Sequence, residues 1–240
     1  MTTQTTRRLA AALMAAASVL AIAGFTALGS VFDYPKVLDS PTAEILTRFR
    51  DNQTAVVAWF AVLVVSAALL APVGVLLGRL AGGRIGRWIA GIGIAAATVQ
   101  VIGLSRWVLL IPRVSDDATV PARADDARRT FELLHTWLGQ ALGETVGYAL
   151  TATFTVLVVQ AVTRRIAPRW LAVAGYTSAG LIATGVVIPL GIGAASMTNF
   201  VGYVAWCLWL IAMAVVLWRS RADTDGQGVG LDGARVPALR

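Results

Sequence analysis

Residues 138–159 read LGQALGETVGYALTATFTVLVV, an apolar run long enough for a helix to cross a lipid bilayer. A helix rises about 1.5 Å per residue, so roughly 20 residues cover a hydrocarbon core of about 30 Å. The rest of the chain has the same character, because 57% of its 240 residues are hydrophobic, only 14% are charged and the mean hydropathy is +0.72. One soluble core of this size would not hide so much apolar surface. The sequence therefore predicts an all-α fold, a polytopic bundle of transmembrane helices.

Six stretches of this kind occur along the chain. The predicted spans are residues 9–31, 53–78, 88–112, 136–162, 170–193 and 199–218. Together they make one predicted domain, 9–218, between a short N-terminal segment, 1–8, and a Gly-rich polar tail, 219–240, that we expect to be disordered. The first stretch also has the charged start, apolar centre and small residues of a secretory signal peptide. Its apolar run continues to about 24 residues, which favours a retained span.

Basic residues predict the orientation of the bundle. Arginine clusters precede the first span, separate the second from the third, separate the fourth from the fifth and follow the sixth: Arg7 and Arg8; Arg79, Arg84 and Arg87; Arg164, Arg165 and Arg169; Arg219 and Arg221. With six spans all four clusters lie on one side, and the positive-inside rule makes that side cytoplasmic. Trp88, Trp170 and Trp218 beside these clusters fit an aromatic belt. The outer loops also hold arginines, although acids accompany them there. We expect both termini in the cytoplasm.

Several function classes are disfavoured by the residue inventory. The single cysteine, Cys207, excludes a disulfide framework within the chain and a cysteine metal cluster, and the lone His135 excludes a bis-histidine haem. Although the pI is about 10.7, the arginines are spread over segment ends, so we expect no nucleic-acid partner. The sequence contains no nucleophile with a positioned base, no metal-ligand cluster and no phosphate loop. We therefore predict no enzymatic activity and no cofactor.

Glu144 is the most unusual residue of the fourth span, because a lone charge there costs about 2.5–3.5 kcal/mol even on a lenient insertion scale. Gly139, Gly143 and Gly147 recur every four residues and predict a stripe without side chains, against which a neighbouring helix packs closely. A polar stripe follows the same helical period beside it: Gln140, Glu144, Tyr148, Thr151 and Thr155. Glu144 is therefore expected to face protein.

Arg106 in the third span is the predicted partner of Glu144. Counted from the outer ends of their predicted spans, Arg106 lies about 9 Å deep and Glu144 about 12 Å deep. Consecutive antiparallel helices favour neighbouring positions, so we expect an Arg106–Glu144 ion pair, with Gln100 and Gln140 as hydrogen-bonding groups nearby. Two interpretations stay open, a structural contact that fixes helix packing and a site for a ligand or a proton. His135 at the outer interface is expected to be a hydrogen-bonded residue.

Several ordered motifs resemble those of one family. They are FDYPKVLDSPTAEILTRF from Phe32, LSRWVLLIP from Leu104, FELLHTWLGQALGETVGYALTATFT from Phe131, PRWLAVAGYTSAG from Pro168 and NFVGYVAWCLWLIA from Asn199. Over about residues 10–219 the chain resembles a bacterial integral-membrane family catalogued only as a domain of unknown function. The resemblance implies a single six-helix domain in the bacterial inner membrane, without an assigned activity, cofactor or substrate. The polar stripe lies within these motifs, which favours it as the site.

Two functions of different classes remain. The first is a non-enzymatic membrane protein whose outer-leaflet polar pocket, roofed by the FDYP loop, binds or senses an unknown small ligand or supports a partner, either a second copy of the chain or another membrane protein. The alternative is a proton-coupled or ion-coupled transporter that uses Glu144. PVGV from Pro72 and PLGI from Pro189, in the second and fifth spans, are a weak indication of paired broken helices in a transporter. Inward of Thr155 the fourth span reads VLVVQAV, which provides no continuous polar path and favours binding.

Overall fold

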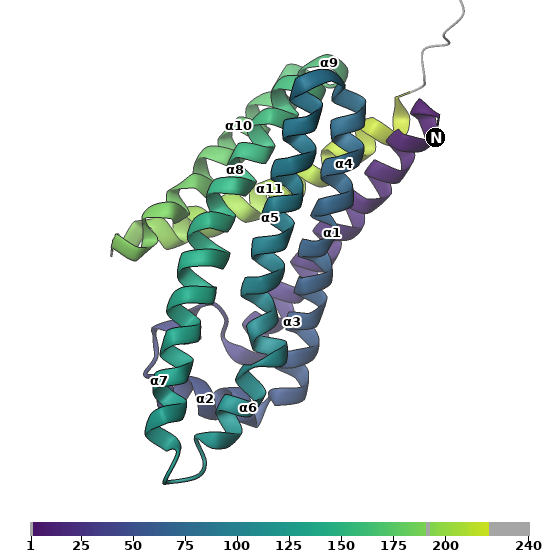
Figure 1. The fold of residues 1–240 in the computed structure, drawn as a ribbon. Coiled ribbons are helices and arrows are strands. Elements are labelled where there is room, and N and C mark those ends of the chain that lie inside the picture. The colour runs from purple at the N-terminus through teal and green to yellow at the C-terminus, as the bar shows by residue number, and fades with distance from the viewer. Residues whose placement is uncertain (1, 191–192, 221–240) are drawn as a thin grey trace, which may run out of the picture.

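A computed structural model of the chain describes residues 2–190 and 193–220, and these residues form a bundle of helices without strands (Figure 1). Six helices are long and apolar enough to cross a membrane: Thr3–Phe32, Gln53–Ala81, Gly83–Asp117, Ala124–Ile166, Arg169–Pro189 and Ala194–Arg219. Each coincides with one predicted span, so the all-α, six-span architecture is confirmed. Most of the predicted disordered tail, residues 221–240, lies outside the described residues.

The six spans are assembled from shorter elements. The first is α1 (Thr3–Phe32), the second α3 (Gln53–Ala68) with α4 (Leu70–Ala81), and the third α5 (Gly83–Leu109) with α6 (Ile111–Asp117). The fourth comprises α7 (Ala124–Leu134), the π-helix η2 (His135–Val146), α8 (Gly147–Val158), the π-helix η3 (Val159–Thr163) and α9 (Arg164–Ile166). The fifth is α10 (Arg169–Ala183) with the 3-10 helix η4 (Thr184–Leu190), and the sixth is α11 (Gly193–Arg219). Between the first and second spans lie η1 (Lys36–Asp39) and α2 (Thr42–Asp51).

Three spans are interrupted near prolines, and the third span of the chain breaks at Leu110, shortly before Pro112. The second span breaks at Leu69, shortly before Pro72, and the fifth changes from α-helix to 3-10 helix at Thr184, with Pro189 inside the 3-10 segment. Proline has no N–H, and its ring clashes with the carbonyl four residues earlier, so the turn before it is loosened. All three interruptions therefore follow from local sequence.

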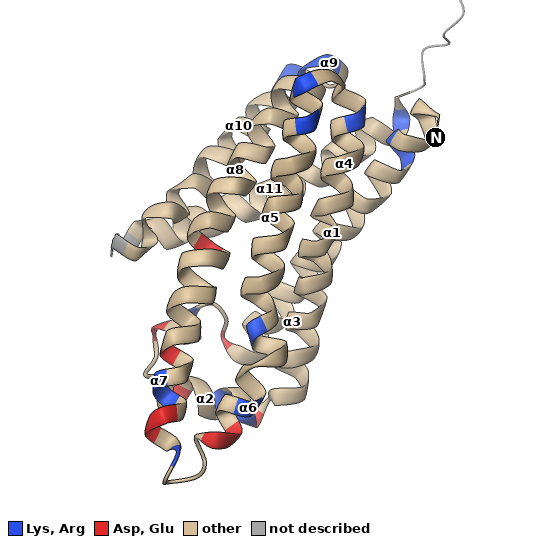
Figure 2. Ribbon diagram, viewed as in Figure 1, with Lys and Arg blue, Asp and Glu red and all other residues tan. Residues whose placement is uncertain are grey.

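Charge distinguishes the two ends of the molecule (Figure 2). At the end where α1 begins and α11 finishes, the described residues include many arginines and no aspartate or glutamate. At the opposite end, around α2, α6 and α7, acidic and basic residues occur together. Trp88, Trp170 and Trp218 are exposed by 56%, 62% and 55%, as expected of an aromatic belt near the arginines. The predicted arginine clusters that fall within the described residues thus share one end.

The third and fourth spans are longer than the fifth and sixth, with 35 and 43 residues against 21 and 26. Figure 1 shows that α10 ends and α11 begins part-way along α5 and the fourth span, while α6 and α7 lie farther out. An outer hydrophobic core fills that extension and is centred on Trp107, which stacks on Phe60 with ring centroids 4.9 Å apart. The amphipathic helix α2 covers it with Ile45, Leu46 and Phe49, all buried. A separate inner core joins the remaining length of the bundle.

Candidate functional site

The central part of the predicted site lies where the fourth span is a π-helix. Gln140 and Glu144 belong to η2, together with Gly139 and Gly143, whereas Tyr148 lies in the following α8. A π-helix forms hydrogen bonds between residues five apart and has more residues per turn than the α-helix that the sequence predicted here. Such segments usually occur as single turns and are frequent at functional sites, so the 12 residues of η2 mark this stretch as unusual.

The glycines of the fourth span allow close approach to α5. A Cβ atom on Gly103 of α5 would lie only 2.8 Å from the Cα of Gly143. A Cβ on Gly139 would lie 2.7 Å from Nη2 of Arg106, and one on Gly147 would lie 3.4 Å from Cγ of Gln100. The glycine stripe therefore packs against α5, and Gly103 is a matching glycine that the sequence analysis did not single out.

Arg106 is buried in the last turn of α5, with 5% of its surface exposed. Its Nη1 donates a hydrogen bond to the carbonyl of Gly103 at 2.5 Å, and its guanidinium lies against Gly139. The Cζ atom lies 5.4 Å from the ring centroid of Trp107, within the range of a cation–π contact. A guanidinium has five N–H donors, and within the described residues only this one hydrogen bond to it is formed. Arg106 therefore retains donors for another partner.

Glu144 is half-buried, and its carboxylate makes no hydrogen bond and no ion pair within 4.0 Å in residues 2–190 and 193–220. The predicted direct ion pair with Arg106 is therefore not formed. The reason is Gly139: without a side chain there, the guanidinium settles on the η2 backbone and bonds to its own helix instead of extending to Glu144.

Gln100 lies farther in along α5 and does not contact Glu144 by a hydrogen bond. Its Nε2 donates to Oγ1 of Thr151 at 2.8 Å, which links α5 to α8. One turn farther inward, Nε1 of Trp206 in α11 donates to Oγ1 of Thr155 at 2.7 Å. The next residues inward, including Val158, Val159 and Val162, are buried in the inner core, so the polar side chains are interrupted between Thr155 and the buried Thr163.

Tyr148 connects the site to the last two spans. Its ring packs edge-on against Tyr203 of α11 with centroids 5.5 Å apart. It also lies over Gly185 of η4, because a Cβ at Gly185 would collide with the Tyr148 ring. The fifth and sixth spans thus border the site on the side away from α5.

His135 belongs to the aromatic cluster more than to the polar site. Its ring stacks on Phe131 with centroids 5.9 Å apart and an interplanar angle of 7°. Its Nδ1 is buried without a hydrogen-bond partner in the described part of the chain, and so is Nε1 of Trp107. The expected hydrogen bond of His135 is therefore absent at Nδ1. Gln140 is half-buried in η2, and no hydrogen bond to it forms among the described residues.

Tyr34 of the FDYP loop is a site residue that the sequence analysis did not name. Its ring packs edge-on against Phe60 with centroids 5.3 Å apart. Burial, followed by the nearby charge of Glu144, raises the pKa of the Tyr34 hydroxyl from 10.0 to about 12, while the Arg106 charge acts in the opposite direction. Tyr34 thus stays protonated at neutral pH and places a hydroxyl near both charges. We call Tyr34, Arg106, Gln140, Glu144 and Tyr148 the outer polar site.

The fold and this site define the class of protein. Among the described residues, no group of three or more His, Cys, Asp and Glu side chains is arranged to hold a metal ion. Six apolar spans and a polar site toward one end are the features of a multi-pass α-helical membrane protein. The chain belongs to the family described as a domain of unknown function (DUF4386), which matches residues 9–214 and confirms the resemblance seen in its motifs. No curated protein and no solved structure matches the chain.

Proposed function

We propose that this chain is a non-enzymatic, multi-pass protein of the bacterial cell membrane whose outer polar site binds a small ligand. The observation that supports this most is the unused hydrogen-bonding capacity of two opposite charges. Arg106 uses one of its donors, and the Glu144 carboxylate uses none of its acceptor sites in the described residues. Charged groups removed from water are stabilised by polar partners, so a ligand that bonds to the largely buried Arg106 and the half-buried Glu144 would be favoured.

The two charged groups of the site indicate which kind of ligand it can bind. An anionic group would accept paired hydrogen bonds from Arg106, since guanidinium donors match a carboxylate in geometry. A cationic group would neutralise Glu144, and the hydroxyls of Tyr34 and Tyr148 supply neutral contacts. A small zwitterion such as a free amino acid carries both groups. We therefore propose this ligand class.

The proposed orientation places the basic end in the cytoplasm and the outer polar site on the opposite face of the membrane. The charged residues described at the basic end are all arginine, and this supports the proposed orientation, because an excess of Lys and Arg characterises cytoplasmic loops. Both termini would then be cytoplasmic, and the ligand would come from outside the cell.

A second candidate function is transport coupled to Glu144. The interruptions of the second span at Leu69 and of the fifth at Thr184 favour it, since broken helices occur at the binding sites of transporters. The buried valines inward of Thr155 argue for binding instead, because they leave no polar path along the fourth span. Binding is therefore our primary proposal.

The test titrates the purified full chain in detergent with a panel of free amino acids. Binding is measured by calorimetry and by the shift in thermal unfolding. Matched amines and carboxylates that carry only one of the two charges serve as comparison ligands. We expect a zwitterion to bind the wild type and to bind Arg106→Met and Glu144→Gln at least 10-fold more weakly, the equivalent of about 1.4 kcal/mol for a lost charged contact.

Asp126→Asn is the matched control, because it removes an exposed carboxylate at the same end of the molecule. It should bind like the wild type. The proposal fails if no zwitterion binds the wild type at millimolar concentration, or if all three variants bind equally well.

A further inference from the structure

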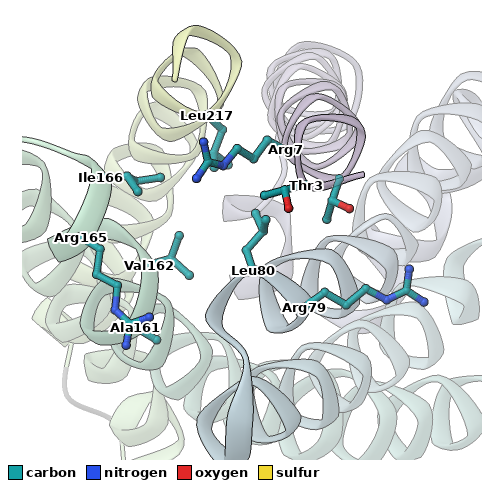
Figure 3. A pocket seen from close by; sticks show the side chains of 10 residues that line it. Thr3, Arg7, Arg79, Leu80, Ala161, Val162, Arg165, Ile166 and Leu217 are labelled. Carbon is teal, nitrogen blue, oxygen red and sulfur yellow. The ribbon is translucent and has the colours of Figure 1, made fainter. Parts of the chain in front are cut away.

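A cavity of about 460 Å³ lies at the basic end of the bundle, far from the outer polar site (Figure 3). Its walls come from four parts of the chain, namely the start of α1, the end of α4, the η3–α9 segment and the end of α11. Ligand pockets usually measure 300–1,000 Å³, so the cavity is large enough for part of a small molecule. Neither the outer polar site nor the proposed ligand uses it.

The lining of the cavity is both basic and apolar. Arg7, Arg79 and Arg165 line it from α1, α4 and α9, and Leu80, Val162 and Leu217 are among its apolar residues. Figure 3 shows Arg7 extending between α1 and the apolar side chains, Arg165 on one side and Arg79 with its guanidinium turned outward. A ligand with a charged head and a hydrocarbon portion would match this combination.

The charge at this end favours an anion. The described residues here include many arginines and no aspartate or glutamate, so their summed charge is positive. Every basic side chain of the described residues at this end is arginine, whose planar group donates paired hydrogen bonds to phosphate. Basic pockets between membrane helices on the cytoplasmic side, where the proposed orientation places this end, bind the head groups of anionic lipids.

We propose that this cavity binds a phosphate-bearing anion, and that the ligand is an anionic phospholipid. Arg7 and Arg165 contact the phosphate, while Leu80, Val162 and Leu217 contact the first carbons of an acyl chain. The apolar wall distinguishes a lipid from a soluble phosphate compound, because a soluble compound would leave that surface unused.

The experiment titrates the delipidated full chain in detergent with phosphatidylglycerol and counts bound lipid by native mass spectrometry. Phosphatidylcholine with the same acyl chains tests the need for net negative charge, and glycerol 3-phosphate tests a soluble source of phosphate. We expect phosphatidylglycerol to bind in preference to phosphatidylcholine. Each arginine in contact with the phosphate should contribute about fivefold in affinity, so Arg7→Gln/Arg165→Gln should bind about 30-fold more weakly.

The matched control is Arg84→Gln/Arg169→Gln, which removes two exposed arginines from the same end but outside the cavity. The affinity of this control variant for phosphatidylglycerol should fall by less than threefold. If the double variant does not fold, the single variant Arg165→Gln, which changes an exposed residue, replaces it. Its affinity for phosphatidylglycerol should fall about fivefold. Equal losses in the two double variants, or equal binding of the two lipids, overturn the proposal. If glycerol 3-phosphate binds as tightly as the lipid and depends on the same arginines, the phosphate site stands and the lipid assignment is overturned.

Discussion

At the scale of single residues, Arg106 is held by Gly139 and by its own helix, so its contribution to stability should be nearly independent of Glu144. We predict that Arg106→Met lowers the free energy of unfolding by about 1–3 kcal/mol, because it removes a buried hydrogen-bonded group. Glu144→Gln should change it by less than about 1 kcal/mol, since no hydrogen bond is lost. Equilibrium unfolding of the ligand-free protein in detergent, for both single variants and the double variant, measures these changes.

The double variant decides between separate charges and a direct pair. If the two charges act separately, the losses in unfolding free energy of the two single variants should add up to that of the double variant to within about 1 kcal/mol. A direct buried pair costs about 3–5 kcal/mol when one partner is removed, and much of that loss is recovered when both are absent. A recovery above about 2 kcal/mol would show that Arg106 and Glu144 touch in solution.

The rare charges of the site were identifiable from sequence, whereas their contacts were not. Arg106 and Glu144 stand out because charged side chains are uncommon in apolar spans. Tyr34 has no such local signal, since it joins the site only because the outer loop folds back over the bundle. The missing ion pair also depends on a distant residue, because it is Gly139 on the facing helix that gives the guanidinium another place to lie.

At the scale of elements, the contact of α5 with η2 depends on the absence of a single side chain. Gly103→Ala should destabilise the protein by about 1–3 kcal/mol, because its Cβ would meet the backbone at Gly143. Gly91→Ala, in the same helix, is the matched control: no atom outside its own helical surroundings lies within 4 Å of its Cβ position. It should be neutral or stabilising by up to about 1 kcal/mol, since alanine favours helix.

Thermal unfolding of both glycine variants in the same detergent provides the comparison. Similar stabilities would mean that α5 and η2 are farther apart than the structure describes.

The existence of these helices was predictable, because length and apolar composition alone define a span. The π-helical form of η2 was not, since a four-residue repeat of glycines suits both α-helical and π-helical turns and only the backbone hydrogen bonds distinguish them.

At the scale of the whole molecule, the proposed orientation can be tested by cysteine labelling of intact cells. The only native cysteine, Cys207, is buried, and Cys207→Ser would provide a background without reactive thiols. Thr119→Cys, in the exposed segment between α6 and α7, should react with a membrane-impermeant maleimide. Pro168→Cys, exposed at the basic end, should react only after the cells are permeabilised. The reverse pattern would place the basic end outside.

The depth of the outer polar site follows from the unequal lengths of the spans. The predicted depth of Glu144 was counted from the outer end of the fourth span, but that helix continues outward to Ala124. Counted instead from the basic end, Glu144 is 164 − 144 = 20 residues from Arg164, and Arg106 is 106 − 87 = 19 residues from Arg87. At the rise of an α-helix each length is about 30 Å, and it is slightly less where the fourth span is π-helical. A hydrocarbon core is about 30 Å thick.

Trp137, exposed by 65%, lies seven residues farther out than Glu144, in the direction of the outer head-group layer. With the arginines of the basic end at the inner boundary of the hydrocarbon, as in the proposed orientation, Glu144 and Arg106 would lie near its outer boundary. Water, protons and small solutes could then reach the Glu144 carboxylate sideways through the head groups. A ligand bound under our proposal would come from the fluid next to the outer face of the membrane, and no transport across the membrane would be needed.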